Sequence, residues 1–136
     1  MRHNFIFVYG LLKSIYENEP AKFIRRNCTL IGDGIIPGRL YDLGNYPGVI
    51  YDKNSFSKVY GEVYLIDRNE KELVQFLDNF EGVGSQFKQP NEYIRSTIPV
   101  NISTGVIESS TYLYNWNLEK AKVIDSGKYE SIKGNR

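Results

Sequence analysis

Short strand-like segments recur along this sequence, and glycine or proline lies at most of their boundaries. Residues 5–9 (FIFVY) form a continuous apolar run that Gly10 ends, whereas residues 59–66 alternate in polarity. A continuous apolar run predicts a strand buried on both faces, and alternation predicts a strand with one buried face. The chain therefore has to build a sheet with tight turns. Four further segments are predicted to form strands: 35–43, 49–52, 94–102 and 106–116.

Two segments instead show the periodicity of helices. Pro20 opens a short helix over residues 21–26, since proline is tolerated in a first helical turn. A longer helix is expected to begin at Asp67 as its N-cap, with Glu70 three residues on, and to end at Gly82 in the left-handed conformation. One apolar stripe runs along this longer helix: Leu73, Val74, Leu77 and Phe80.

Together these elements predict an α+β domain whose sheet curls into a barrel. The length of 136 residues fits one domain, 1–136, that buries a core without disulfides or metal. We expect the core to span about residues 4–116, because the tail from Glu119 onward is polar and has little periodicity.

The charge balance and hydropathy exclude two classes of partner. The chain has 17 Lys and Arg against 16 Asp and Glu, whereas nucleic-acid binding needs a clustered excess of positive charge. No stretch approaches the roughly 20 apolar residues of a membrane span. The apolar run at residues 5–12 is followed by Lys13 rather than by the small residues of a leader-peptide cleavage site. We therefore expect neither a nucleic-acid partner nor a membrane partner.

Cys28 is the only cysteine and His3 the only histidine. One cysteine cannot form an intrachain disulfide and fits a reducing compartment, so we expect a cytoplasmic location. A zinc site built from cysteine and histidine needs several such ligands, and the glycine motifs of nucleotide-binding loops are missing, so we expect no metal and no cofactor. Any catalysis must therefore depend on carboxylates, tyrosines, lysines or the backbone.

Glu81 is the first candidate for such catalysis. It lies at the C-terminal end of the longer predicted helix, where the exposed carbonyls make a carboxylate unfavourable by about 0.3 to 1 kcal/mol. That field, together with burial beside Phe80, would raise its pKa and make it a better proton acceptor near neutral pH. The alternative is a solvated glutamate in a helix cap, which the residues alone favour.

Two further candidates follow from strand positions. The turn at residues 9–12 directly follows the first buried strand, and a strand end with Gly10 can direct several backbone N–H groups toward an anion or a developing oxyanion. The alternative is an ordinary turn. Tyr93 and Arg95 lie on one face of a strand, either for function or for sheet-surface packing. Tyrosine supplies 11 of the 19 aromatic residues, which suits a half-wet cavity, an interface or simply strand preference.

Five motifs occur in order between Val8 and Tyr114. In this order they resemble the signatures of the gamma-glutamylcyclotransferase-like family, and the short chain is most similar to the compact gamma-glutamylamine cyclotransferase branch and its bacterial relatives. The motifs are residues 8–13 (VYGLLK), 38–48 (GRLYDLGNYPG), 59–64 (VYGEVY), 77–82 (LDNFEG) with 93–95 (YIR), and 112–114 (YLY).

The resemblance implies a small mixed β-barrel with flanking short helices and a cavity at the strand ends. It implies a reaction in which the α-amine of a small gamma-glutamyl amide attacks its own γ-carbonyl, giving 5-oxoproline and an amine or amino acid without metal or cofactor. Glu81 carries over as the general acid/base. The backbone of Tyr9, Gly10, Leu11 and Leu12 carries over as a cradle for the glutamyl portion, and three tyrosines would line the pocket: Tyr46, Tyr93 and Tyr114.

Two positions depart from the family pattern. Leu11 stands where the family usually has threonine, and Lys13 stands where it has arginine. The loss of the threonine hydroxyl motivates an alternative of another class, a non-catalytic module that binds a small ligand in the same cavity. A third alternative is a protein-interaction domain with a tyrosine-rich surface. The motifs leave the amine half of the substrate and the oligomeric state open.

Overall fold

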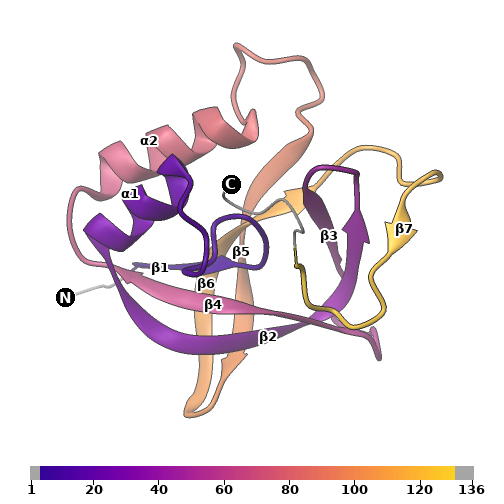
Figure 1. Cartoon of the computed structure of the whole chain (residues 1–136), viewed down its shortest axis with the longest axis horizontal. Coiled ribbons are helices and arrows are strands. Elements are labelled where there is room, and N and C mark those ends of the chain that lie inside the picture. The colour runs from indigo at the N-terminus through magenta and orange to yellow at the C-terminus, as the bar shows by residue number, and fades with distance from the viewer. Residues whose placement is uncertain (1–3, 131–136) are drawn as a thin grey trace.

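The structure, a computed structural model, describes residues 4–130 and builds seven strands and two helices from them (Figure 1). His3 lies outside these residues. In chain order the elements are β1 (Asn4–Val8), α1 (Glu19–Asn27), β2 (Cys28–Asp42), β3 (Pro47–Tyr51), β4 (Lys58–Ile66), α2 (Glu70–Glu81), β5 (Tyr93–Ile102), β6 (Gly105–Tyr114) and β7 (Lys122–Val123).

Five strands form a closed barrel in the order β2, β4, β1, β6, β5, and β5 pairs back with β2. The barrel is mixed, because β1 runs parallel to β6 while the other neighbouring strands are antiparallel. β3 and β7 pair with the last part of β2 and extend the sheet beyond the barrel. The α+β class and the mixed barrel with two short flanking helices are thereby confirmed.

Two contacts between barrel strands are narrow, and we call them seams. β1 and β6 share one paired position, Ile6 with Ser110, and β2 and β5 share one, Ile35 with Asn101. By contrast, β5 and β6 pair with each other along their whole length. The backbone ladders that join the β5–β6 hairpin to the other barrel strands are therefore confined to the two seams.

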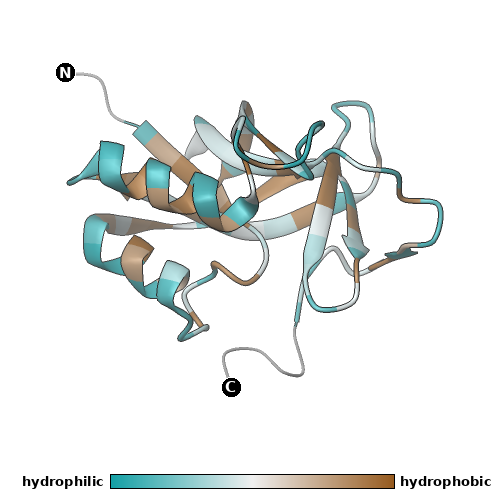
Figure 2. Cartoon of the chain, turned by 90° about the horizontal axis from the view of Figure 1, so that it is seen from above, coloured by the Kyte–Doolittle hydropathy of each residue, from teal (hydrophilic) through white to brown (hydrophobic). Residues whose placement is uncertain are grey.

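β1 is buried on both sides, as its apolar sequence predicts. Phe7 points into the barrel interior, where it packs with Val59 and Val63 of β4. Ile6 and Val8 point the other way and pack beneath the two helices, in a cluster that also holds Tyr64, Ile24, Leu73 and Leu77. Figure 2 shows hydrophilic and hydrophobic residues alternating along both helices, as expected for helices with one buried face.

The helices begin and end close to their predicted positions, with one correction. α1 begins after Asn18, whose side chain accepts a hydrogen bond from the amide of Ala21. The expected N-cap of α2, Asp67, is wrong: the cap is Asn69, and the Asp67 carboxylate instead accepts hydrogen bonds from Thr29 and Arg68. No helix within residues 4–130 is long and apolar enough to cross a membrane.

The segment after β6 adds to the core beyond residue 116. β7 pairs with the end of β2, and the amide of Tyr60 donates a hydrogen bond to the carbonyl of Gly127. Tyr129 is 4% exposed and packs among the side chains of the barrel interior. The polar tail predicted from the sequence therefore carries one buried aromatic anchor.

Candidate active site

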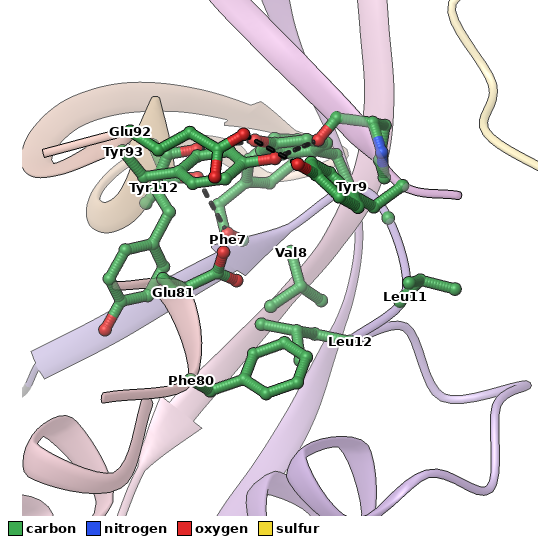
Figure 3. Close-up of a pocket in the computed structure, with 14 residues that line it drawn as sticks. Phe7, Val8, Tyr9, Leu11, Leu12, Phe80, Glu81, Glu92, Tyr93 and Tyr112 are labelled. Atoms are coloured by element: carbon green, nitrogen blue, oxygen red, sulfur yellow. Dashed lines mark hydrogen bonds between the residues drawn. The ribbon is translucent and has the colours of Figure 1, made fainter. Parts of the chain in front are cut away.

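A cavity of about 200 Å³ opens where β1 leaves the barrel (Figure 3). Its wall is built from the end of β1 and the loop that follows, the loop before β3, the last turn of α2, the residue before β5, and parts of β5 and β6. Most of the candidate residues from the sequence meet here: residues 9–12, Tyr46, Glu81 and Tyr93 all line the cavity.

Glu81 reaches the cavity because α2 ends beside it. Gly82 adopts a φ of 74°, a left-handed conformation that glycine adopts without strain, and the amide of Val83 donates to the carbonyl of Asp78 at 2.8 Å. Glu81 is therefore the last helical residue, and Figure 3 shows its carboxylate pointing into the cavity. Phe80, the expected end of the apolar stripe, is 49% exposed and lines the cavity instead of the core.

The environment of Glu81 favours its protonated form. Burial, and after it the nearby charge of Glu92, raises the pKa of the Glu81 carboxyl to about 8. Within residues 4–130, no side chain or backbone amide donates a hydrogen bond to this carboxylate. A carboxyl group with this pKa and no fixed donor can both accept and return a proton near neutral pH.

The loop after β1 supplies free backbone donors. Gly10 is required here, since a Cβ at this position would lie 2.5 Å from Cγ of Pro47. The carbonyl of Gly10 accepts a hydrogen bond from the amide of Lys13 at 3.1 Å. The amides of Gly10, Leu11 and Leu12 themselves donate to no acceptor in the described part of the chain. Three unpaired N–H groups beside a cavity are suited to bind an anion.

Contacts on the far side of the same loop fix its position. The amide and the hydroxyl of Ser14 both donate to the carboxylate of Glu62 on β4, each at 2.7 Å. The ammonium of Lys13 donates to the carbonyl of Tyr129 at 2.8 Å. Tyr9, at the start of the loop, donates its hydroxyl to the carbonyl of Tyr112 at 2.6 Å. The loop is thus tied to β4, to β6 and to the C-terminal segment.

Tyr93 and Tyr46 form one wall of the cavity. The hydroxyl of Tyr93 donates to the carbonyl of Pro47 at 2.6 Å, and its ring lies 6.4 Å from that of Tyr46. Tyr114 differs from the expectation, because it lies behind this wall rather than on the cavity surface. Its ring meets Tyr93 edge-on at 5.2 Å, so it supports Tyr93 from outside.

Arg95 also lies outside the cavity. It forms a two-pronged ion pair with Asp78 on α2, with its Nε and one terminal nitrogen 2.9 and 3.1 Å from the two carboxylate oxygens. The hydroxyl of Tyr112 donates to the same carboxylate at 2.8 Å. We call these three residues the α2 clamp, since they fix the last turns of α2, and hence Glu81, against β5 and β6.

A family model described as Gamma-glutamyl cyclotransferase, AIG2-like, matches residues 6–131. The chain belongs to this family.

Relatives and solved structures agree with the family. A Vibrio cholerae protein whose name assigns it provisionally to the gamma-glutamylcyclotransferases is 36% identical over 129 residues, or 93% of this chain and 95% of the relative. The Escherichia coli gamma-glutamylcyclotransferase family protein YtfP is 32% identical over 123 residues, or 90% and 92%. An AIG2-like protein from Mus musculus superposes with a TM-score of 0.74 over 96% of this chain and 90% of that one; at 22% identity it shows the fold alone.

Within this gamma-glutamyl cyclotransferase fold, the motifs that carried the resemblance converge on the cavity. The first motif forms the end of β1 and its loop, the second contributes the Tyr46 turn, and the fourth contributes Glu81. The third, on β4, contributes Glu62, which holds the loop from behind. No group of three or more potential metal ligands occurs within residues 4–130.

Glu92 is the carboxylate in the cavity that sequence reasoning missed. It lies just before β5, lines the cavity, and accepts hydrogen bonds from the hydroxyls of Tyr46 and Tyr114 at 2.7 and 3.1 Å. Its position next to Tyr93, at the start of the YIR motif, is the one sequence signal that could have drawn attention to it.

Proposed function

We propose that this protein is a cyclotransferase that cleaves a small gamma-glutamyl amide or peptide by attack of the substrate's own α-amine, with Glu81 as general acid/base. One observation carries the proposal: a carboxyl group with a pKa raised to about 8 shares a cavity with three unpaired backbone amides. Family membership supports cyclotransferase activity in general.

The reaction needs a carrier for protons rather than a protein nucleophile. The α-nitrogen forms a bond to the γ-carbonyl carbon, and the bond from that carbon to the departing nitrogen breaks, which gives 5-oxoproline and an amine. The α-nitrogen loses two protons as an ammonium becomes a lactam N–H, and the departing nitrogen gains two as an amide N–H becomes an ammonium. Glu81 can carry them one at a time, because its pKa lies near the working pH.

The loop amides supply the complementary charge. Ring closure places negative charge on the γ-carbonyl oxygen, and N–H groups that need no reorganisation stabilise such an oxyanion efficiently. A rigid loop also holds the glutamyl chain folded, and orientation of this kind lowers the barrier of an intramolecular attack. The amides of Gly10, Leu11 and Leu12 fit both roles.

The test is the release of 5-oxoproline from a panel of gamma-glutamyl amides and dipeptides. We expect the natural sequence to turn over at least one compound and Glu81→Gln to be slower by at least about 100-fold, the size of a general acid/base contribution. Glu108→Gln, an exposed carboxylate on β6, is the matched control and should behave like the natural sequence. Turnover by Glu81→Gln at an unchanged rate, with intact circular dichroism, would remove Glu81 from the mechanism.

Leu11 favours a second candidate, a module that binds a gamma-glutamyl ligand without cleaving it. Leu11 is one of the residues that line the cavity, and it stands where the family usually has threonine. A thermal shift with gamma-glutamyl compounds, and no 5-oxoproline by mass spectrometry, would support this candidate over the enzyme. The third candidate, a tyrosine-rich interaction surface, is disfavoured because six of the eleven tyrosines are buried.

A further inference from the structure

The cavity holds a second carboxylate, Glu92, to which the proposed reaction assigns no role. Figure 3 shows Glu81 and Glu92 at the same cavity, one from the end of α2 and one from the residue before β5. Among the described residues, those that line the cavity include no lysine, arginine or histidine. These lining residues therefore offer a cationic ligand two carboxyl groups and no competing side-chain cation.

One oxygen of Glu92 is occupied and the other is available. The hydroxyls of Tyr46 and Tyr114 both donate to Oε2, and no described residue donates to Oε1. Burial and contact with Glu92 raise the pKa of both tyrosines to about 12, so both hydroxyls keep their protons near neutral pH. With both hydroxyls on Oε2, the other oxygen of Glu92 is left free to accept a hydrogen bond from a ligand.

The backbone around Glu92 is also held in place. The amide of Asn115 donates to the carbonyl of Glu92 at 2.7 Å, and the side chain of Asn115 donates to the carbonyl of Asn91 at 3.0 Å. The indole N–H of Trp116 donates to the carbonyl of Pro90 at 2.9 Å. Three contacts from the two residues just after β6 therefore fix the segment before β5, which a binding residue needs for precise placement.

We propose that Glu92 binds the α-ammonium of the glutamyl substrate through its free oxygen and holds the nitrogen beside Glu81. The inference rests on the proposed function, because it assigns a partner to the group that attacks. Glu92 positions the ammonium, while Glu81 removes the proton. Two carboxyl groups in different environments thus divide binding and proton transfer between them.

The contact can be tested by binding, without turnover. In the Glu81→Gln background, calorimetry would compare γ-glutamyl-methylamide with glutaric acid monomethylamide, which lacks only the α-ammonium. We expect Glu92→Gln to weaken binding of the first compound by about 10- to 100-fold, the range of a charge-assisted hydrogen bond, and to leave the second unchanged. Glutamine retains an oxygen that can accept from Tyr46 and Tyr114, so the tyrosine contacts can persist.

Glu108→Gln serves again as the control and should alter neither affinity. Equal weakening of both compounds by Glu92→Gln would show a structural role and overturn the proposal. A loss of affinity confined to compounds with a second cation in the amine half would also overturn the proposal, because Glu92 would then bind the leaving group. If the Glu81-containing protein releases no 5-oxoproline but Glu92→Gln still shows the selective loss, the proposed function fails and the Glu92 contact stands.

Discussion

At the scale of single residues, Glu81 places function and stability in opposition. Its carboxyl is buried beside Glu92 and receives no hydrogen bond from a described residue, so the folded protein resists its ionisation. An unfolded chain solvates the same group freely and releases its proton around the ordinary value of 4.5. The folded state therefore holds a proton that the unfolded state gives up between about pH 4.5 and 8.

This difference predicts a stability that falls with pH. The contribution of Glu81 to the free energy of unfolding is complete below pH 4.5 and is lost as pH rises through 8, since the folded state binds the extra proton. Glu81→Gln carries no such proton, so it should gain stability relative to the natural sequence, on the order of 3 kcal/mol between pH 5 and pH 9. Urea unfolding of both proteins at pH 5 and pH 9 measures this change. A difference in unfolding free energy between the two proteins that is the same at both pH values would contradict the pKa assignment.

Sequence reasoning could identify Glu81 but not Glu92, for a physical reason. Glu81 lies in the helix-ending LDNFEG motif, and the family resemblance of that motif favoured it over a solvated glutamate. Gly82 confirms the predicted end of the helix. Glu92 lies in an irregular segment, and its role depends on Tyr46 and Tyr114, which are 46 and 22 residues away in the chain. Contacts between such distant residues depend on the barrel closing, which no local pattern encodes.

At the scale of elements, α2 is positioned by the clamp of Asp78, Arg95 and Tyr112. One carboxylate receives the guanidinium of Arg95 and the hydroxyl of Tyr112, which come from adjacent strands. Asp78 precedes Glu81 by three residues, so nearly one helical turn separates the clamped residue from the proposed acid/base. Loosening the clamp should therefore displace Glu81 before it unfolds the helix.

A double-mutant cycle on the clamp measures this effect. Asp78→Asn and Arg95→Gln should show a coupling of about 1 kcal/mol in urea unfolding, the upper range for a partly exposed ion pair with good geometry. Either change should also slow 5-oxoproline release. The pair of Glu19 and Lys22 on α1, at 3.7 Å and exposed, is the matched control and should couple weakly. Similar coupling in both pairs would argue against a special role for the clamp.

The sequence predicted which elements form better than it predicted where they begin and end. β2 begins at Cys28, directly after α1, although periodicity predicted a strand only from residue 35. The early part of β2 is largely exposed and its pairing with β4 shifts between Leu30 and Gly32, so an alternating pattern is lost there. Pairing with β4 holds this part extended, although its own sequence gives little indication of a strand.

At the scale of the whole molecule, the C-terminal segment links the barrel to the site. Tyr129 packs in the barrel interior, and its carbonyl accepts the hydrogen bond from Lys13 in the loop that carries the free amides. No periodicity marks this contribution, because one aromatic residue in a polar tail carries no pattern.

The cytoplasmic location stays a prediction. It rests on the presence of a single cysteine, Cys28, which cannot form an intrachain disulfide.

Tyr129→Ala tests how much this segment contributes to the free energy of unfolding. Removing a buried aromatic side chain from a packed core should cost about 3 kcal/mol in the free energy of unfolding, measured by urea denaturation. The carbonyl that receives Lys13 belongs to the backbone and persists in the variant. Val123→Ala on β7, where the side chain is 40% exposed, is the control and should cost little. A cost near zero for Tyr129→Ala would mean that the core ends near residue 116.

At the two seams, the β5–β6 hairpin has its shortest backbone ladders with the other barrel strands. The β5–β6 hairpin contains Tyr93 and Tyr112 and follows directly on Glu92, whereas Glu81 and the amide-bearing loop belong to the other part of the molecule. Separation of the hairpin would also have to break side-chain hydrogen bonds that cross this boundary, from Thr111 to Phe7 and from Tyr9 to Tyr112. Closure of the barrel and assembly of the cavity wall therefore depend in part on the same hydrogen bonds.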